Sequence, residues 1–156
     1  MATYEKAIGI MNDLILINND RALGYQKALD ELKGIDLGLR TLFQNFITNS
    51  RRHIAELTNE VLALGGSPAS GTTVAGKVYR AWMDLKTTFK GEDRIAVLSS
   101  CEFGEDAAQN AYKTALEESY SLPSEVRQTI AEQQHTLQRS HDTVKELRDT
   151  EKVLQY

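Results

Sequence analysis

The sequence is poor in the residues that cross-link or break a polypeptide chain. It contains one cysteine, Cys101, and two prolines among 156 residues. A single cysteine excludes an intramolecular disulfide and fits a reducing compartment. A chain of this length buries about 70% of its unfolded surface on folding, so it needs no cross-link to form a core. We therefore expect a single domain over residues 1–156.

Long apolar runs and an excess of positive charge are also missing. The longest apolar run, residues 14–17, is far too short to cross a membrane, and no basic segment followed by an apolar stretch marks a secretory signal. A formal net charge of −4 argues against non-specific binding to nucleic acid. Glycine-rich phosphate loops, nucleophile elbows and paired Cys-x-x-Cys motifs are absent. We expect a cytoplasmic protein with no nucleic-acid or membrane partner.

Apolar residues recur at the three- and four-residue spacing of helices, and strand-like alternation is absent. Glycine at 34 and the run Gly65-Gly66-Ser67-Pro68 are typical of helix ends. Pro123 suits the first turn of a helix, where its missing N–H costs nothing. The predicted helices cover about residues 3–32, 37–64, 74–89, 92–119 and 123–153.

The lengths of the linkers predict the topology. The first two long helices are joined by a few residues, and so are the last two, so each pair should form an antiparallel hairpin. About 26 residues separate the hairpins, and their helix, about 24 Å long, can carry the chain back along the bundle. The second and third long helices should then be parallel. This predicts an all-α, ferritin-like four-helix bundle with one long crossover that contains an extra short helix.

The two hairpins resemble each other in sequence. Tyr25 begins the segment Tyr-Gln-Lys-Ala-Leu, and Tyr112 begins Tyr-Lys-Thr-Ala-Leu. A polar residue precedes each tyrosine by seven positions, and the second helix of each hairpin carries a polar-x-x-His motif. The polar residues paired by this repeat are Asn18 with Glu105, Ser50 with Gln138, and His53 with His141.

All six of these polar residues fall on the apolar stripe of their helix and near its middle. In a bundle of similar helices they should meet at one level, together with Tyr25 and Tyr112. Buried polar groups cost free energy unless they satisfy each other or a ligand. The sequence therefore predicts a buried polar layer, and this layer is the candidate site.

These features resemble the ferritin-like superfamily, whose bundle core holds two metals with one Glu from each of two helices and Glu-x-x-His from each of the others. Over nearly its full length, the chain is most similar to a bacterial family of ferritin-like bundles of about this size and unknown function. The similar segments are residues 24–28, 74–76, 80–86 and 101–106. The resemblance implies the fold but no activity.

The resemblance also implies a ligand set, from which this chain departs. Asn18 stands where the first Glu would be, and Ser50 and Gln138 replace the Glu of each Glu-x-x-His motif. The ligands that remain are Glu105, His53 and His141. Two divalent ions carry a charge of +4, which one carboxylate cannot offset. We therefore do not expect a di-iron oxidase.

Two interpretations of the layer stay open. In the first, Glu105 accepts hydrogen bonds from His53, His141 or a tyrosine, and the protein is a non-enzymatic bundle with a structural or interaction role. Stress physiology would suit that role by analogy with other small ferritin-like proteins. In the second, the protein binds one divalent ion (Zn²⁺, Mn²⁺ or Fe²⁺) through Glu105, His53 and His141. Glu102, one turn before Glu105, could add a second carboxylate.

The crossover helix carries a wide apolar stripe. Its members are Tyr79, Trp82, Met83 and Phe89. The stripe is wider than one contact needs, which predicts a homodimer through the 74–89 helix.

Overall fold

The computed structural model describes residues 2–31, 37–73, 76–88 and 94–154. The helices are α1 (Ala2–Glu31), α2 (Leu37–Ala63), α3 (Lys77–Thr88), α4 (Arg94–Glu117) and α5 (Ser124–Leu154), with a 3-10 turn η2 (Ser119–Ser121) before α5. No β-strand occurs in the described residues, so the all-α prediction is confirmed. The predicted breaks at Gly34 and Gly91 and the end of the crossover helix at Phe89 lie outside these residues.

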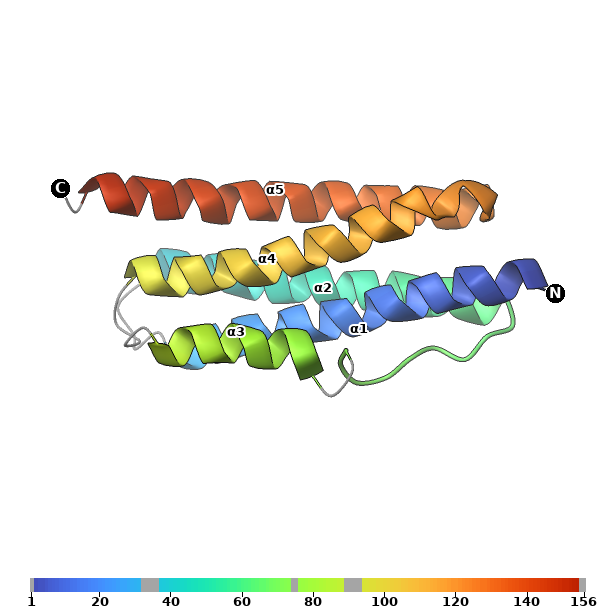
Figure 1. Cartoon of the computed structure of the whole chain (residues 1–156), viewed down its shortest axis with the longest axis horizontal. Coiled ribbons are helices and arrows are strands. Elements are labelled where there is room, and N and C mark those ends of the chain that lie inside the picture. The colour runs from blue at the N-terminus through green and yellow to red at the C-terminus, as the bar shows by residue number, and fades with distance from the viewer. Residues whose placement is uncertain (1, 32–36, 74–75, 89–93, 155–156) are drawn as a thin grey trace.

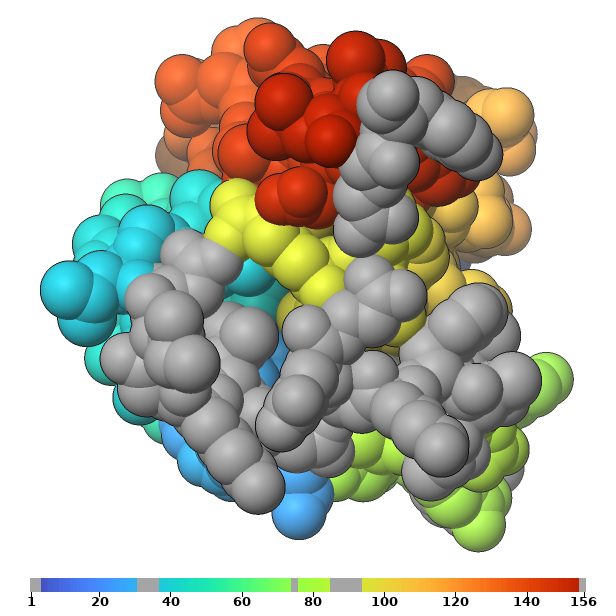
Figure 2. Space-filling model, turned by 90° about the vertical axis from the view of Figure 1, so that its left-hand side faces the viewer, coloured from blue at the N-terminus to red at the C-terminus, as the bar shows by residue number. Residues whose placement is uncertain are grey.

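The helices run as the linker lengths predict. α1 and α2 form one antiparallel hairpin and α4 and α5 the other, while α2 and α4 run in the same direction (Figure 1). α3 lies along the outside of the bundle, packed against α1 and α4. Viewed end-on, α4 lies between α5 on one side and α1 and α3 on the other (Figure 2). This is the one-crossover, ferritin-like arrangement, and the prediction is confirmed.

The sharp end of α2 follows from two successive glycines. Gly65 has a φ of +81°, in the left-handed region where a side chain would be strained. The Gly65 N–H donates to the Leu62 carbonyl at 3.0 Å, and the Gly66 N–H donates to the Val61 carbonyl at 3.0 Å. These two bonds form a Schellman motif, which satisfies the last carbonyls of the helix and turns the chain into the crossover.

Polar side chains of α1 hold the crossover against the bundle. Asn12 donates to the Ser67 carbonyl at 3.1 Å and accepts from the Ala69 N–H at 2.8 Å. Asn19 donates to the Gly71 carbonyl at 2.5 Å. Asp20, which is buried, accepts a hydrogen bond from the hydroxyl of the crossover residue Thr73. The crossover segment before α3 is therefore hydrogen-bonded to α1 along its length, and these bonds fix the position at which α3 begins.

The hydrophobic core has two parts, one toward each end of the bundle. The first part includes Met11, Leu14, Leu57, Val61 and Ile130, and the second includes Phe43, Phe46, Leu98, Cys101 and Val144. Cys101 is a buried residue of the second part. Between the two parts lies a polar layer whose members are Asn18, Arg21, Ser50, His53, Glu105 and Gln133. Among the described helices, none has both the length and the apolar character to span a membrane.

Trp82 anchors α3 to the bundle. Its side chain is fully buried, and its ring stands edge-on to Tyr25, with 5.1 Å between the ring centroids. The ring lies between Gly24 of α1 and Gly104 of α4, where an added Cβ would be 2.3 and 2.2 Å from it. Because these two glycines have no side chains, α3 can pack closely against α1 and α4. Trp82 therefore belongs to the core, and less of the apolar stripe on α3 remains on the outside.

Candidate functional site

A buried ion pair lies at the centre of the polar layer. Arg21 of α1 and Glu105 of α4 have side chains that are 1% and 0% exposed. The guanidinium Nε donates to Glu105 Oε1 at 2.9 Å, and Nη2 lies 2.8 Å from the same oxygen. Burial is the largest single influence and opposes the charged form of Arg21, but the charge and the hydrogen bond of Glu105, together with smaller effects of Tyr25 and Tyr112, leave the pKa of Arg21 raised overall. A charged pair thus joins α1 to α4.

Arg21 also reaches α2. Its Nη1 donates to the Phe46 carbonyl at 2.9 Å and to Ser50 Oγ at 2.8 Å. Its Cζ lies 5.2 Å from the ring centroids of both Tyr25 and Phe46, within the range of cation–π attraction. One cation therefore contacts groups on three helices at the level where the predicted polar residues converge.

Tyr25 completes the surroundings of the carboxylate. Its hydroxyl donates to Glu105 Oε1 at 2.5 Å. Burial and the nearby Glu105 carboxylate raise the pKa of Tyr25 well above its usual value, so the phenol stays neutral and remains a donor. Glu105 Oε2 makes no hydrogen bond among the described residues. The prediction that Glu105 lies buried at mid-bundle beside a tyrosine of the layer is confirmed.

A second group of hydrogen bonds leads from the layer toward the surface. Asn18 Nδ2 donates to the Tyr112 hydroxyl at 2.8 Å, and that hydroxyl donates to Gln133 Oε1 at 2.6 Å. Gln133 Nε2 then donates to Glu56 Oε1 at 3.0 Å. Glu56 is exposed, so the buried amides and phenol end on a solvated carboxylate. Each donor finds an acceptor, as buried polar groups require.

His53 is neutral and belongs to this second group. Its Nδ1 lies 3.3 Å from Asn18 Oδ1. Since Asn18 Nδ2 already donates to the Leu14 carbonyl and to Tyr112, its oxygen is the acceptor, and we assign the His53 proton to Nδ1. Burial, and then the charges of Arg21 and Arg52, lower the pKa of His53 to about 3.

Two residues predicted for the layer, Gln138 and His141, lie at its outer edge instead. Gln138 donates to Asp142 Oδ1 at 3.0 Å, and His141 is 17% exposed. The buried stripe of α5 passes through Leu137, Ser140 and Val144. The sequence prediction placed the buried position four residues after Leu137 and three before Val144, which is His141. In the structure the buried position is three residues after Leu137 and four before Val144, which is Ser140. Both choices fit helical periodicity.

Arg21 and Gln133 are the layer residues that the sequence did not predict. Arg21 follows Asn18 by three positions and precedes Tyr25 by four, so periodicity places it inward. Arginine is rarely buried without a partner, and that partner, Glu105, is remote in the sequence. Gln133 likewise precedes Leu137 by four. The spacing of Arg21 and Gln133 therefore indicated buried positions, but both are residue types that are usually exposed, and neither was predicted to be buried.

The three predicted ligands do not come together. Glu105 is bonded to Arg21 and Tyr25, His53 to Asn18, and His141 to Asp106. In the described part of the chain, the one group of three histidine, cysteine, aspartate or glutamate side chains with converging ligand atoms is Glu102, Asp106 and His141. It lies at the α4–α5 seam, and Glu105 and His53 are not part of it.

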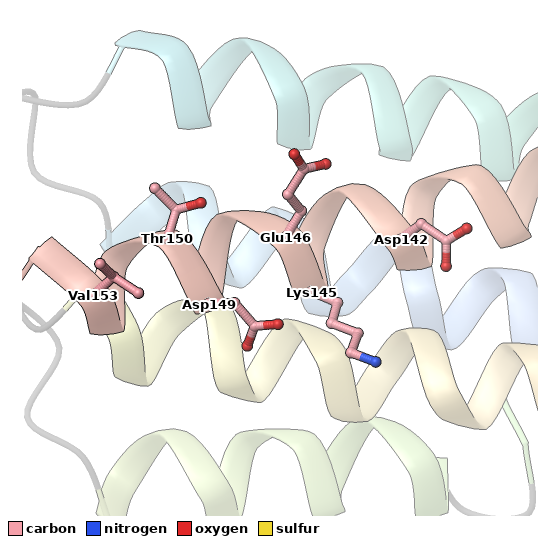
Figure 3. Close-up of a pocket in the computed structure, with 6 residues that line it drawn as sticks. All are labelled: Asp142, Lys145, Glu146, Asp149, Thr150 and Val153. Atoms are coloured by element: carbon pink, nitrogen blue, oxygen red, sulfur yellow. The ribbon is translucent and has the colours of Figure 1, made fainter.

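A shallow depression of about 400 Å³ runs along the C-terminal half of α5 (Figure 3). Its lining residues are Asp142, Lys145, Glu146, Asp149, Thr150 and Val153. All six belong to α5, so within the described part of the chain no residue of a second element lines the depression. It offers no enclosed site for a small molecule.

Residues 6–118 match a family model described as "Domain of unknown function (DUF2383)". Among solved structures, a mutant of Mycobacterium smegmatis Dps1 is similar with a TM-score of 0.81 and 16% identity, over 94% of this chain and 97% of that one. A crystal structure of "ferritin like, diiron-carboxylate proteins" from Bacillus anthracis str. Ames gives a TM-score of 0.75 at 16% identity, over 95% and 99%. Curated protein sequences yield no match. At these identities the neighbours establish the fold alone.

Proposed function

This chain belongs to the DUF2383 family of unknown function, and we propose that it is a non-catalytic ferritin-like bundle with a structural or interaction role. The observation that carries this proposal is the buried contact between Arg21 and Glu105, with 2.8 Å between Nη2 and Oε1. A fixed cation is bonded to the one carboxylate of the layer. The core is therefore neutralised from within the chain, and its role is to hold the helices together.

A di-iron centre of the kind that the name of the Bacillus anthracis protein implies does not fit this layer. Such a centre needs several carboxylates to offset its charge. Here Glu105 is the carboxylate that pairs with Arg21, and its Oε1 already accepts bonds from Arg21 and Tyr25. The buried carboxylate of Asp20 is bonded to Thr73 of the crossover instead. The free oxygen, Oε2, lies on the same carboxylate and brings no further charge. A divalent ion at this level would be repelled by the guanidinium without compensation.

The rival function is binding of one divalent ion by Glu105, His53 and His141. It requires Glu105 to leave Arg21, and it requires His141 to turn away from Asp106, whose Oδ1 is 2.6 Å from His141 Nε2. Removing one partner of a buried ion pair is strongly unfavourable. The contacts of the described residues therefore favour the structural role.

The proposal is tested by iron binding and oxidation with protein purified without a histidine tag. We expect wild type and Glu105→Gln to consume oxygen with Fe²⁺ at the rate of the buffer alone. His135→Asn serves as the parallel variant, because it removes an exposed histidine and leaves the ion pair intact. Binding of iron ions that is lost in Glu105→Gln and retained in His135→Asn would overturn the proposal.

A further inference from the structure

We infer that the seam between α4 and α5 binds one divalent transition-metal ion through Glu102, Asp106 and His141. One oxygen of each carboxylate and one ring nitrogen of His141 all lie within 4.8 Å of one another. This seam is outside the polar layer, and none of its three residues takes part in the Arg21–Glu105 ion pair. Metal binding at the seam is therefore independent of the proposed structural role of the core.

The fold places these side chains together through helix geometry. Glu102 and Asp106 are one turn apart on α4, so they lie on the same face of the helix. Each follows a buried residue, Cys101 and Glu105, which sets the pair at the edge of the core. His141 comes from α5, which η2 holds antiparallel to α4. The three donors therefore come from one hairpin.

Two of the three donors are largely buried, so the group is not a patch of fully solvated acids. The side chains of Glu102 and His141 are 15% and 17% exposed, whereas Asp106 is 55% exposed. An ion here would have two donors fixed by packing and one at the solvent side, with positions left for water. Reduced exposure also strengthens the attraction between the ion and the carboxylates.

The ring of His141 is held in the orientation that metal-binding histidines usually show. Its Nε2 lies 2.6 Å from Asp106 Oδ1, while its Nδ1 lies 3.4 Å from Asp142 Oδ1. Gln138 Nε2 in turn donates to Asp142 Oδ1 at 3.0 Å. A carboxylate behind a metal-binding histidine fixes the orientation of its ring. The arrangement thus supplies an outer partner for the one nitrogen ligand.

Arg148 supplies the positive charge that an ion would bring. It forms an ion pair with Glu102, and its Nη2 also lies 2.9 Å from Asp149 Oδ1. An ion bound to Glu102 would take over this contact, and Arg148 would keep Asp149. Arg148 is therefore a competitor within the chain, and its removal should strengthen metal binding.

Two carboxylates and one imidazole favour a particular class of ion. Ca²⁺ and Mg²⁺ prefer sites made of oxygen alone, whereas an imidazole ligand suits Zn²⁺, Co²⁺, Mn²⁺ and Fe²⁺. We expect Zn²⁺ and Co²⁺ to bind more tightly than Mn²⁺, following the general order of divalent affinities.

Calorimetric titration with Zn²⁺ and visible spectroscopy with Co²⁺, on tag-free protein, test the inference. We expect about one ion per chain, with affinity reduced at least about tenfold in His141→Asn and increased in Arg148→Gln. His135→Asn is the matched control, since it removes an exposed histidine of the same helix and should bind as wild type does. Circular dichroism verifies that each variant is folded.

Two results would overturn this assignment. The first is the absence of binding at micromolar Zn²⁺ in both wild type and Arg148→Gln. The second is equal binding by wild type and His141→Asn. If Glu105→Gln abolished binding while His141→Asn did not, the ion would lie in the core, and the proposed structural role would fail as well.

Discussion

Arg21 and Glu105, which are remote in the sequence, form an ion pair in which neither side chain is more than 1% exposed. The pair lies between the two parts of the hydrophobic core, where it brings opposite charges together within the chain. Its guanidinium also bonds to the Phe46 carbonyl and to Ser50. The contact therefore joins α1, α2 and α4.

Removing one partner of this pair should destabilise the fold strongly. Arg21→Met leaves the Glu105 carboxylate buried without a counter-charge, and Glu105→Gln leaves the guanidinium in the same position. We expect each change to lower the free energy of unfolding by about 3–5 kcal/mol. The double variant removes both charges and should lose clearly less than the sum of the two. Urea unfolding followed by circular dichroism measures all three.

The surface pair Arg94–Glu151, with 2.8 Å between Nε and Oε1, provides the control. Glu151→Gln should cost about 1 kcal/mol or less, because these side chains are partly solvated. Additive losses in the Arg21 and Glu105 double variant would show that the two charges do not interact.

The neutral His53 should make the fold sensitive to acid. In the folded chain its pKa is lowered to about 3 by burial and by Arg21, while in the unfolded chain it returns to about 6.5. Below pH 6.5 the unfolded chain therefore takes up a proton that the folded chain does not. Stability should fall between about pH 6.5 and pH 3, by up to about 1.4 kcal/mol per pH unit from this group.

Replacing His53 should flatten this part of the stability profile. His53→Asn, measured by urea unfolding at several pH values, is expected to show a weaker dependence than wild type. His135→Asn, at an exposed position of α5, should keep the full dependence. If wild type and His53→Asn have the same slope between pH 6 and pH 4, His53 is hydrated in the folded state.

The topology could be predicted from the sequence because it depends on lengths. The long link between the hairpins allowed only a crossover that returns along the bundle, and the internal repeat fixed the pairing of the helices. The level of the polar layer also followed, because Asn18, Ser50, His53 and Glu105 each interrupt an apolar stripe. Apolar stripes and their interruptions are local patterns, so they can be identified from helical periodicity in the sequence alone.

The chemistry of the layer could not be predicted, because it depends on one long-range contact and on the rotation of one helix. Without Arg21, Glu105 has no fixed cation, so the sequence suggested a network in which Glu105 accepts hydrogen bonds from His53, His141 or a tyrosine. The rotation of α5 that turns Ser140 inward was equally compatible with the spacing that favoured His141. Packing against α4 and α2 decides between them, and a single helix sequence does not contain that information.

The predicted homodimer through residues 74–89 is an expectation for solution measurements. Trp82 is buried against the bundle and is not accessible to a second copy. A dimer contact would therefore involve the half-buried Tyr79 and Met83. Light scattering at high concentration should report twice the chain mass, and Tyr79→Glu should reduce it to one chain. Arg80→Glu, at an exposed neighbouring position, should leave the mass unchanged. A monomeric wild type at high concentration would remove the homodimer.

The contact of Trp82 with two glycines gives the most specific test of the fold. A Cβ at Gly104 would lie 2.2 Å from the Trp82 ring, and one at Gly24 would lie 2.3 Å from it. The ring is held against Tyr25 and has no free space, so Gly104→Ala or Gly24→Ala must push it outward. We expect each change to destabilise the protein by at least about 1–3 kcal/mol, as overpacking does. Trp82 is the only tryptophan, so its fluorescence should shift to longer wavelength as water reaches the ring.

Gly9→Ala is the matched control, because α1 has open space there and alanine favours the helix. This change should stabilise the fold by about 0.5–1 kcal/mol. If Gly104→Ala matched Gly9→Ala in stability and left the fluorescence unchanged, α3 would not pack on the bundle through Trp82.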